Sequence, residues 1–245
     1  MDKKPQIVVP NYEGYHNSSP DTSIRLSKSK SYQDLSTICI VPCHGGIPPK
    51  IVQSWRGMMT PMNQKFIMIM VENMEVGAAY SETIQMILDN PELSKWKYIL
   101  TLEHDNAPPP DGLLKLYEST DKYDGIGGIY FTKGAGGQPM CYGDTSKPVN
   151  FIPFEPKPES VTPCYGIAMG FSLFKIEMFK DKRLPRPLFE TKQSYTPGIG
   201  AQAYTQDLKF CEEAGKLGYK FAIDSRVKVG HYDYTGAAGI PDFMW

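Results

Sequence analysis

The residues with the clearest chemical potential are Glu103 and Asp105, two carboxylates separated by one histidine in the segment YILTLEHDNAPPPD. The apolar run before them, Tyr98–Leu102, predicts a buried strand, and the pair follows its carboxyl end. This end borders the ligand-binding crevice of open α/β sheets, where alternate residues point to the same side. Unpaired carboxylates repel each other unless a cation lies between them, and oxygen ligands suit Mg²⁺ or Mn²⁺. The alternative is two ordinary polar residues that close a strand, since acidic pairs are common.

Three further polar residues stand at the ends of predicted strands or at the start of a predicted helix. Glu72 ends the apolar segment Phe66–Val71, His231 follows the segment Val227–Gly230, and Asp207 lies in the first turn of a predicted helix. Each also has an ordinary explanation. Glu72 can be a solubilising charge at a strand end, His231 a surface residue, and Asp207 an acid favoured by the helix dipole. Residue type alone leaves the three roles open.

Buried-type strands alternate with amphipathic helices from residue 37 onward, which predicts an α/β fold. The predicted strands are 37–42, 66–71, 98–102, 125–130, 166–174, 219–223 and 227–230. The predicted helices are 49–59, 78–89, a helix capped by Asp111, 176–181 and a helix from Thr205 to Gly218. Strands that are apolar throughout and separated by helices indicate a mostly parallel central sheet covered on both faces.

The chain divides by composition into a polar N-terminal part and one domain. Residues 1–35 predict an extension that is flexible or wrapped around the domain, and residues 36–245 predict a single domain with a short C-terminal tail. The segments 131–163 and 182–204 are too long for ordinary connections, which indicates a functional role. Their aromatic side chains can stack on sugars or bases, or pack on their own domain; they are Phe131, Tyr142, Phe151, Phe154, Phe189, Tyr195 and Tyr204.

Charge and hydropathy exclude several classes of protein. The 245 residues include 26 Lys and Arg against 27 Asp and Glu, so the net charge is −1 and a chain-wide nucleic-acid-binding surface is not expected. The mean hydropathy is −0.36, and no apolar run has the length of a membrane span or signal peptide. We therefore expect a cytoplasmic protein without a membrane span. The five cysteines include no CxxC pair, which argues against a zinc site or a disulfide framework.

Several separated segments together resemble the GT-A-fold glycosyltransferases, especially glycosyltransferase family 2 and its relatives. The acidic segment at 103–105 resembles the DxD motif of these enzymes. The other segments follow in the family's order: ICIVPCHGG at 38–46, GIAMGFSLFKIEMF at 166–179, PLFE at 187–190 and TQDLKFCEEAGKLGYKFAIDSRVKVGH at 205–231. The resemblance covers about residues 36–232 and implies a single GT-A-like, Rossmann-like domain.

The resemblance also implies how a donor and a metal ion are bound. Asp105 would bind a Mn²⁺ or Mg²⁺ ion that bridges the two phosphates of a nucleotide-diphospho-sugar, such as a UDP-sugar. Glu103 would contact the metal or the ribose, and His231 would be a third metal ligand. Pro42, in the opening loop, and Glu72 would contact the nucleoside.

The resemblance implies that Asp207 is the catalytic residue. In inverting relatives an aspartate at this place deprotonates the acceptor hydroxyl, so the resemblance implies an inverting transfer with Asp207 as general base. The sequence does not decide whether the acceptor is a saccharide, a protein or a modified nucleic acid.

Two departures from the family pattern leave other functions open. Glu103 replaces the first aspartate of the motif, and Gln206 replaces a glutamate before the helical aspartate. One alternative is a nucleotidyltransferase, although CHGGIPPK lacks the basic, glycine-rich loop that such an enzyme would need. Another is a non-catalytic carbohydrate-binding domain of the same fold.

Overall fold

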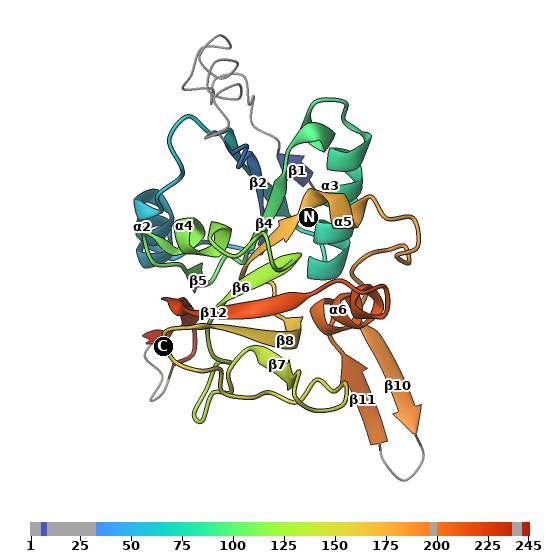
Figure 1. Ribbon diagram of the computed structural model, residues 1–245. Helices are drawn as coiled ribbons and strands as arrows, with labels where there is room; N and C mark the ends of the chain where they lie inside the picture. The colour runs from blue at the N-terminus through green and yellow to red at the C-terminus, as the bar shows by residue number, and fades with distance from the viewer. Residues whose placement is uncertain (1–5, 9–32, 197–199, 237–241) are drawn as a thin grey trace.

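The computed structural model describes residues 6–8, 33–196, 200–236 and 242–245. Its centre is a nine-stranded sheet of order β1-β3-β2-β4-β9-β6-β12-β8-β7 (Figure 1). In this order the strands are β1 (Gln6–Val8), β3 (Phe66–Glu72), β2 (Thr37–Cys43), β4 (Tyr98–Leu102), β9 (Phe171–Lys175), β6 (Gly125–Ile129), β12 (Phe221–Lys228), β8 (Val161–Ile167) and β7 (Cys141–Asp144).

Six of these nine strands point in one direction, and β1, β8 and β9 run against them. The predicted α/β fold with a mostly parallel central sheet is thus confirmed. The insertion of the antiparallel β9 between β4 and β6 was not predicted. It separates the parallel trio β3-β2-β4 from the parallel pair β6-β12.

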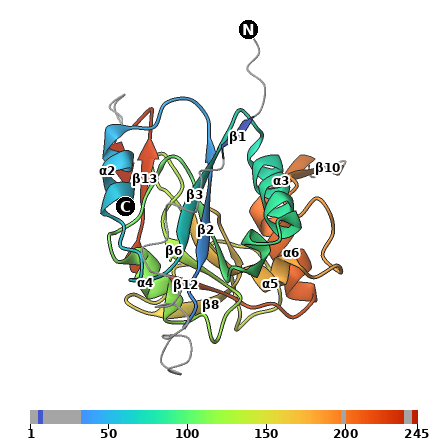
Figure 2. The ribbon, with the colours of Figure 1, turned by 90° about the horizontal axis from the view of Figure 1, so that it is seen from above.

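Helices cover both faces of the sheet, as the apolar strands require. On one face α3, α5 and α6 supply Tyr80, Phe179 and Phe210 to a large core cluster. On the other face α4 supplies Leu113 and Leu116 to a second cluster, against which α2 packs. Figure 2 shows the two groups of helices on opposite sides of the strands. The helices are α2 (Pro49–Gly57), α3 (Val76–Asp89), α4 (Gly112–Tyr117), α5 (Ile176–Phe179), α6 (Gln206–Lys216) and the short 3-10 helix η2 (Leu93–Lys95).

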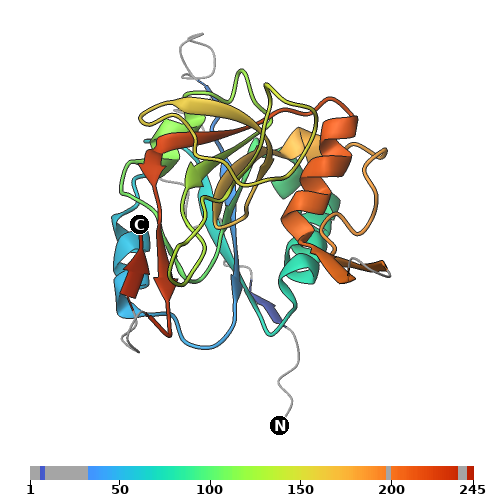
Figure 3. The same cartoon turned by 90° about the horizontal axis from the view of Figure 1, so that it is seen from below.

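Two smaller sheets complete the described structure. The strands β5 (Asn106–Ala107), β13 (Gly230–Asp233) and β14 (Asp242–Met244) form one of them. Figure 3 shows the C terminus beside α2, where Lys50 lies 3.6 Å from Asp242. The hairpin β10 (Lys192–Thr196) and β11 (Gly200–Tyr204) projects from the body below α6 (Figure 1).

Several predicted elements differ from the observed ones. The predicted strand 166–174 is two strands, β8 and β9, which are separated by a turn at residues 168–170. Gly170 is required in that turn, because an added Cβ would lie 2.5 Å from the Tyr130 ring and hydroxyl. The predicted strands 219–223 and 227–230 are largely one strand, β12, and the two predicted long loops contain β7 and the β10–β11 hairpin.

The predicted N-terminal extension contributes β1, which pairs antiparallel with β3 at the edge of the sheet. Residues 1–5 and 9–32 lie outside the described residues. None of the helices that the structure describes is long and apolar enough to cross a membrane.

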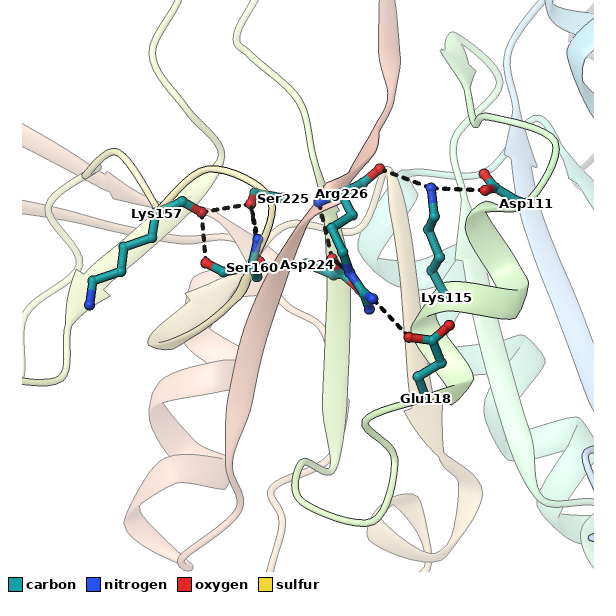
Figure 4. A network of polar contacts seen from close by, with 8 residues as sticks. All are labelled: Asp111, Lys115, Glu118, Lys157, Ser160, Asp224, Ser225 and Arg226. Atoms are coloured by element: carbon teal, nitrogen blue, oxygen red, sulfur yellow. Dashed lines mark hydrogen bonds and ion pairs between the residues drawn. The ribbon is translucent and has the colours of Figure 1, made fainter.

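A polar network fastens α4 to β12 (Figure 4). The carboxylate of Asp224, which is 0% exposed, accepts two hydrogen bonds from the Arg226 guanidinium, at 2.9 and 2.7 Å. Arg226 also pairs with Glu118, just past the end of α4, at 2.8 Å. Lys115 of α4 pairs with Asp111 at 2.8 Å and reaches the Arg226 carbonyl oxygen at 3.4 Å. The network therefore joins the helix that follows the acidic motif to the strand that leads to His231.

We expect Asp224→Ala to lower the free energy of unfolding by about 3 kcal/mol, because it leaves the partly buried guanidinium with one carboxylate fewer. Denaturant unfolding monitored by fluorescence measures the loss. Lys228→Ala is the control on the same strand, because Lys228 pairs with Glu159 where both side chains are exposed. It should cost less than about 1 kcal/mol. Equal losses in the two variants would contradict the structural role of the network.

Candidate functional site

The described structure holds a pocket of about 820 Å³ at the carboxyl ends of β2, β3 and β4. This is the side at which open α/β sheets bind their ligands. The lining residues are Pro42, Cys43, His44, Asn73, Met74, Glu75, Val76, Glu103, His104 and Asp105. Three segments distant in sequence thus bring the predicted residues Pro42, Glu103 and Asp105 to one cavity.

Strand pairing brings His231 beside Asp105, although His231 does not itself line the pocket. β13 pairs antiparallel with β5, which places His231 opposite Asn106, and the Tyr232 N–H donates to the Asp105 carbonyl oxygen at 2.7 Å. The His231 Nε2 atom consequently lies 3.6 Å from Asp105 Oδ2. Both side chains are nearly buried, with 12% and 11% of their surfaces exposed.

The hydrogen bond of His231 Nδ1 determines whether its other ring nitrogen, which faces Asp105, can act as a metal ligand. Its Nδ1 atom lies 2.7 Å from the carbonyl oxygen of Phe131. A carbonyl oxygen only accepts hydrogen bonds, so Nδ1 carries a proton, and in the neutral ring Nε2 then presents a lone pair. That lone pair faces a carboxylate oxygen, and two acceptors at such a distance favour a cation between them. Histidines that bind metal ions typically donate their other ring N–H in this way.

Asp105 has a second feature that suits a cation. Its Oδ1 atom is buried and has no hydrogen-bond partner, while Oδ2 is contacted by Lys133 at 2.5 Å and faced by His231. Burial opposes ionisation of this carboxyl, but hydrogen bonds from the protonated form of the His231 ring and from the Lys133 ammonium outweigh it and hold its pKa well below the usual range when no metal ion replaces these protons. Asp105 is therefore an ionised carboxylate whose Oδ1 atom has no hydrogen-bond partner.

The described residues contain no cluster of three or more His, Cys, Asp or Glu side chains that could hold a metal ion. Asp105 and His231 nevertheless fit one, with an unpartnered oxygen and an imidazole nitrogen as ligands. Further ligands would come from water or a bound phosphate, which is how Mg²⁺ and related ions are usually held.

Glu103 has a different electrostatic environment from Asp105. Burial of its carboxyl, followed by the negative charges of Asp105 and Asp207, raises the pKa of Glu103 to about 8. At neutral pH this side chain holds its proton and can donate a hydrogen bond. It suits a hydroxyl group of a ligand better than it suits a cation.

Asp207 lies near this group but is more enclosed. It stands at the start of α6 with 6% of its surface exposed, and its Oδ1 accepts the Leu208 N–H at 2.8 Å. Burial raises the pKa of Asp207, which strengthens it as a base. Its charge acts on the Glu103 carboxyl, so the two acids belong to one electrostatic cluster.

Glu72 differs in position from the other predicted residues. It ends β3 beside Cys43 of β2, and its side chain is exposed. The next residue, Asn73, adopts a left-handed conformation with φ of 60° and lines the pocket together with Met74. Glu72 thus stands at the rim of the cavity.

The sequence does not single out Lys133 and Tyr234, which complete the site. Lys133 contacts Asp105, and its ammonium lies 5.5 Å from the centre of the Tyr234 ring. The Tyr234 ring in turn lies 6.2 Å from the His104 ring. Their only sequence signals are position: Lys133 precedes a glycine-rich segment, and Tyr234 follows His231 by three residues.

Comparison with solved structures identifies the architecture. The chain is similar to A197 from STIV, with a TM-score of 0.57 and 16% identity over 86% of this chain and 94% of that one. It is also similar to GalNAc-T7, solved with UDP, GalNAc and Mn²⁺, with a TM-score of 0.53 and 12% identity over 82% of this chain. The fold is GT-A-like.

The match to GalNAc-T7 spans 44% of that chain, so it concerns one part of a larger protein. No protein-family model and no curated protein sequence matches this chain. At these identities the likeness establishes the GT-A-like glycosyltransferase fold and leaves the chemistry to the residues of the pocket.

Proposed function

We propose that this protein transfers a sugar from a nucleotide-diphospho-sugar, such as a UDP-sugar, to an acceptor hydroxyl with inversion at the anomeric carbon. One observation carries the proposal: at an 820 Å³ pocket lined by Asp105, the His231 Nε2 atom lies 3.6 Å from Asp105 Oδ2, and the other carboxylate oxygen, Oδ1, has no hydrogen-bond partner. The GT-A-like fold supports it, as does the binding of UDP, GalNAc and Mn²⁺ by one structural neighbour.

In this proposal Asp105 and His231 hold Mn²⁺ or Mg²⁺. Such an ion, when bound, neutralises negative charge on the departing nucleoside diphosphate. Pro42 lines the pocket where the nucleoside enters, and Glu72 at the rim contacts its base or ribose. Glu103, which keeps its proton at neutral pH, donates a hydrogen bond to a ribose hydroxyl.

Asp207 acts as the general base. The acceptor oxygen forms a bond to the anomeric carbon while the bond from that carbon to the phosphate oxygen breaks, and the acceptor proton passes to Asp207. The raised pKa of this buried carboxyl favours the proton transfer.

The acceptor enters through a second cavity of about 620 Å³, which shares Glu75 with the donor pocket. Thr191, in its lining, lies 3.4 Å from the side-chain oxygen of Gln206, the residue beside Asp207. A residue of this lining therefore contacts the neighbour of the proposed base.

Calorimetric titration of the full chain with UDP and GDP, in Mn²⁺ and in EDTA, tests the proposal. We expect one nucleotide to bind in Mn²⁺ at least tenfold more tightly than in EDTA, which corresponds to about 1.4 kcal/mol. Equal affinities in the two buffers would remove the metal from the mechanism. Metal-dependent binding without sugar transfer or donor hydrolysis would favour a non-catalytic binding domain.

A further inference from the structure

Lys133 forms the closest charged contact in the site. Its ammonium lies 2.5 Å from Asp105 Oδ2, the same oxygen that faces His231 at 3.6 Å. The Lys133 side chain is 34% exposed, whereas that of Asp105 is 11% exposed. A partly exposed cation therefore already contacts one oxygen of the carboxylate that is proposed to bind a metal.

The loop around Lys133 holds this lysine at the edge of the pocket. Phe131 and Pro139 pair across its base, and the Thr132 N–H donates to the Gln138 carbonyl oxygen at 2.9 Å. Gly134 adopts a left-handed conformation with φ of 88°, and no atom would lie within 4 Å of a Cβ added there. The base of the loop is thus held by backbone contacts, and the space beside Gly134 is open.

Lys133 also borders a second cavity, which could take up its side chain if a metal ion displaced it from Asp105. A shallow cavity of about 400 Å³ is lined by Lys133, Gly134, Asp233, Tyr234 and Thr235. The ammonium already lies 5.5 Å from the centre of the Tyr234 ring, a distance at which a cation is attracted to an aromatic face. The described structure has no ion pair between Lys133 and Asp233, whose Oδ1 accepts hydrogen bonds from the Thr235 N–H and hydroxyl.

The negative charge of the pocket lining means that an anionic ligand would need a nearby cation such as Lys133. The pocket lining contains the carboxylates of Glu75 and Asp105 and the protonated Glu103, but no lysine or arginine among the described residues. A nucleoside diphosphate carries several negative charges and would be repelled by such a lining without a cation. Lys133 is the described lysine that contacts a lining carboxylate, and lysine is a common point-charge partner of phosphate.

We propose, on the basis of the proposed function, that Lys133 competes with the metal ion for Asp105 and binds the diphosphate of the donor once it is displaced. The ammonium and a divalent ion repel each other and cannot both contact Oδ2 at full strength. Lys133 thus neutralises Asp105 in the free protein, weakens metal binding in the absence of donor, and supplies a second positive charge when the nucleotide arrives. Metal and nucleotide binding are consequently coupled.

Mn²⁺ binding without nucleotide tests the first half of the proposal. We expect Lys133→Met to bind Mn²⁺ about tenfold more tightly than the wild type, as measured from the electron paramagnetic resonance signal of free Mn²⁺. Lys133→Arg, which keeps the charge, should stay near the wild type. Lys147→Met is the matched control, because Lys147 is an exposed lysine that pairs with Asp144 outside the pocket lining. Unchanged Mn²⁺ affinity in Lys133→Met would overturn the competition.

UDP and GDP calorimetry in saturating Mn²⁺ tests the second half. Loss of a charge-assisted contact should weaken nucleotide binding to Lys133→Met by about 10- to 100-fold, with Lys133→Arg and Lys147→Met near the wild type. A wild type that binds nucleotide and a Lys133→Met variant that binds it equally well would overturn the role of Lys133 alone. A wild type that binds neither nucleotide would overturn the proposed function, while the Mn²⁺ measurement would still decide the competition.

Discussion

Asp207→Asn should retain donor binding while sugar transfer falls by on the order of 10²–10⁴, the range expected for removal of a general base. The carboxylate is proposed to act on the acceptor proton, so its loss leaves the contacts of the nucleotide intact. Donor affinity is measured by calorimetry, and transfer is measured as release of nucleoside diphosphate in the presence of acceptor. Inversion is checked by NMR of the first-formed product.

The surroundings of Asp207 make asparagine a conservative change for the fold. The bond that its Oδ1 accepts from the Leu208 N–H can be kept by the amide oxygen of asparagine. We expect the free energy of unfolding to change by about 1 kcal/mol or less. Glu212→Gln is a matched control, since Glu212 lies on the same helix and pairs with Lys216 near the surface. Near-normal turnover in Asp207→Asn, or retention at the anomeric carbon, would remove Asp207 as the base and leave the proposed metal site untouched.

Four of the parallel strands, β2, β3, β4 and β6, could be predicted from the sequence almost to the residue. β2 and β4 are buried along their whole length, so each appears as an uninterrupted apolar run. β12 was predicted as two strands because Asp224 and Arg226 interrupt its apolar pattern. The two side chains pair with each other, which allows polar residues to lie within a single strand.

The turn between β8 and β9 could not be predicted from hydropathy. Its residues, Ala168, Met169 and Gly170, are as apolar as the strands on either side and give no polar signal. The turn depends on a tertiary contact: the Gly170 N–H donates to the Tyr130 hydroxyl at 2.8 Å, and the close approach excludes a side chain. An interaction between residues 40 positions apart therefore determines a local feature.

Of the candidate site, too, one part could be predicted from the sequence and another could not. Glu103 and Asp105 could be predicted from their place after a buried strand, whereas a nearby His231 was expected only from the family resemblance. The contact itself depends on the pairing of β5 with β13, and β5 has just two residues. Lys133 could not be predicted, because a lysine in an irregular loop looks like any solvated side chain until the fold places it on Asp105.

Asp105→Asn should abolish the effect of Mn²⁺ on nucleotide binding. The variant keeps the size of the side chain but removes the negative charge, so the site beside His231 loses its anionic metal ligand. We expect the affinity for UDP or GDP in Mn²⁺ to fall about 10- to 100-fold, to the value that the wild type shows in EDTA. EDTA should then have no further effect on the variant.

The matched control for this change is Asp111→Asn, six residues further along the same loop. Asp111 forms an ion pair with Lys115 at 2.8 Å and its side chain is 44% exposed, so its removal takes away a carboxylate without touching the pocket. Its nucleotide affinity should remain metal-dependent. Loss of binding in both variants would point to a general effect of charge, and a persistent Mn²⁺ effect in Asp105→Asn would place the metal elsewhere. Because Lys133 remains in Asp105→Asn, a further fall in nucleotide affinity when Lys133→Met is added to this variant would report the contribution of the lysine without the metal.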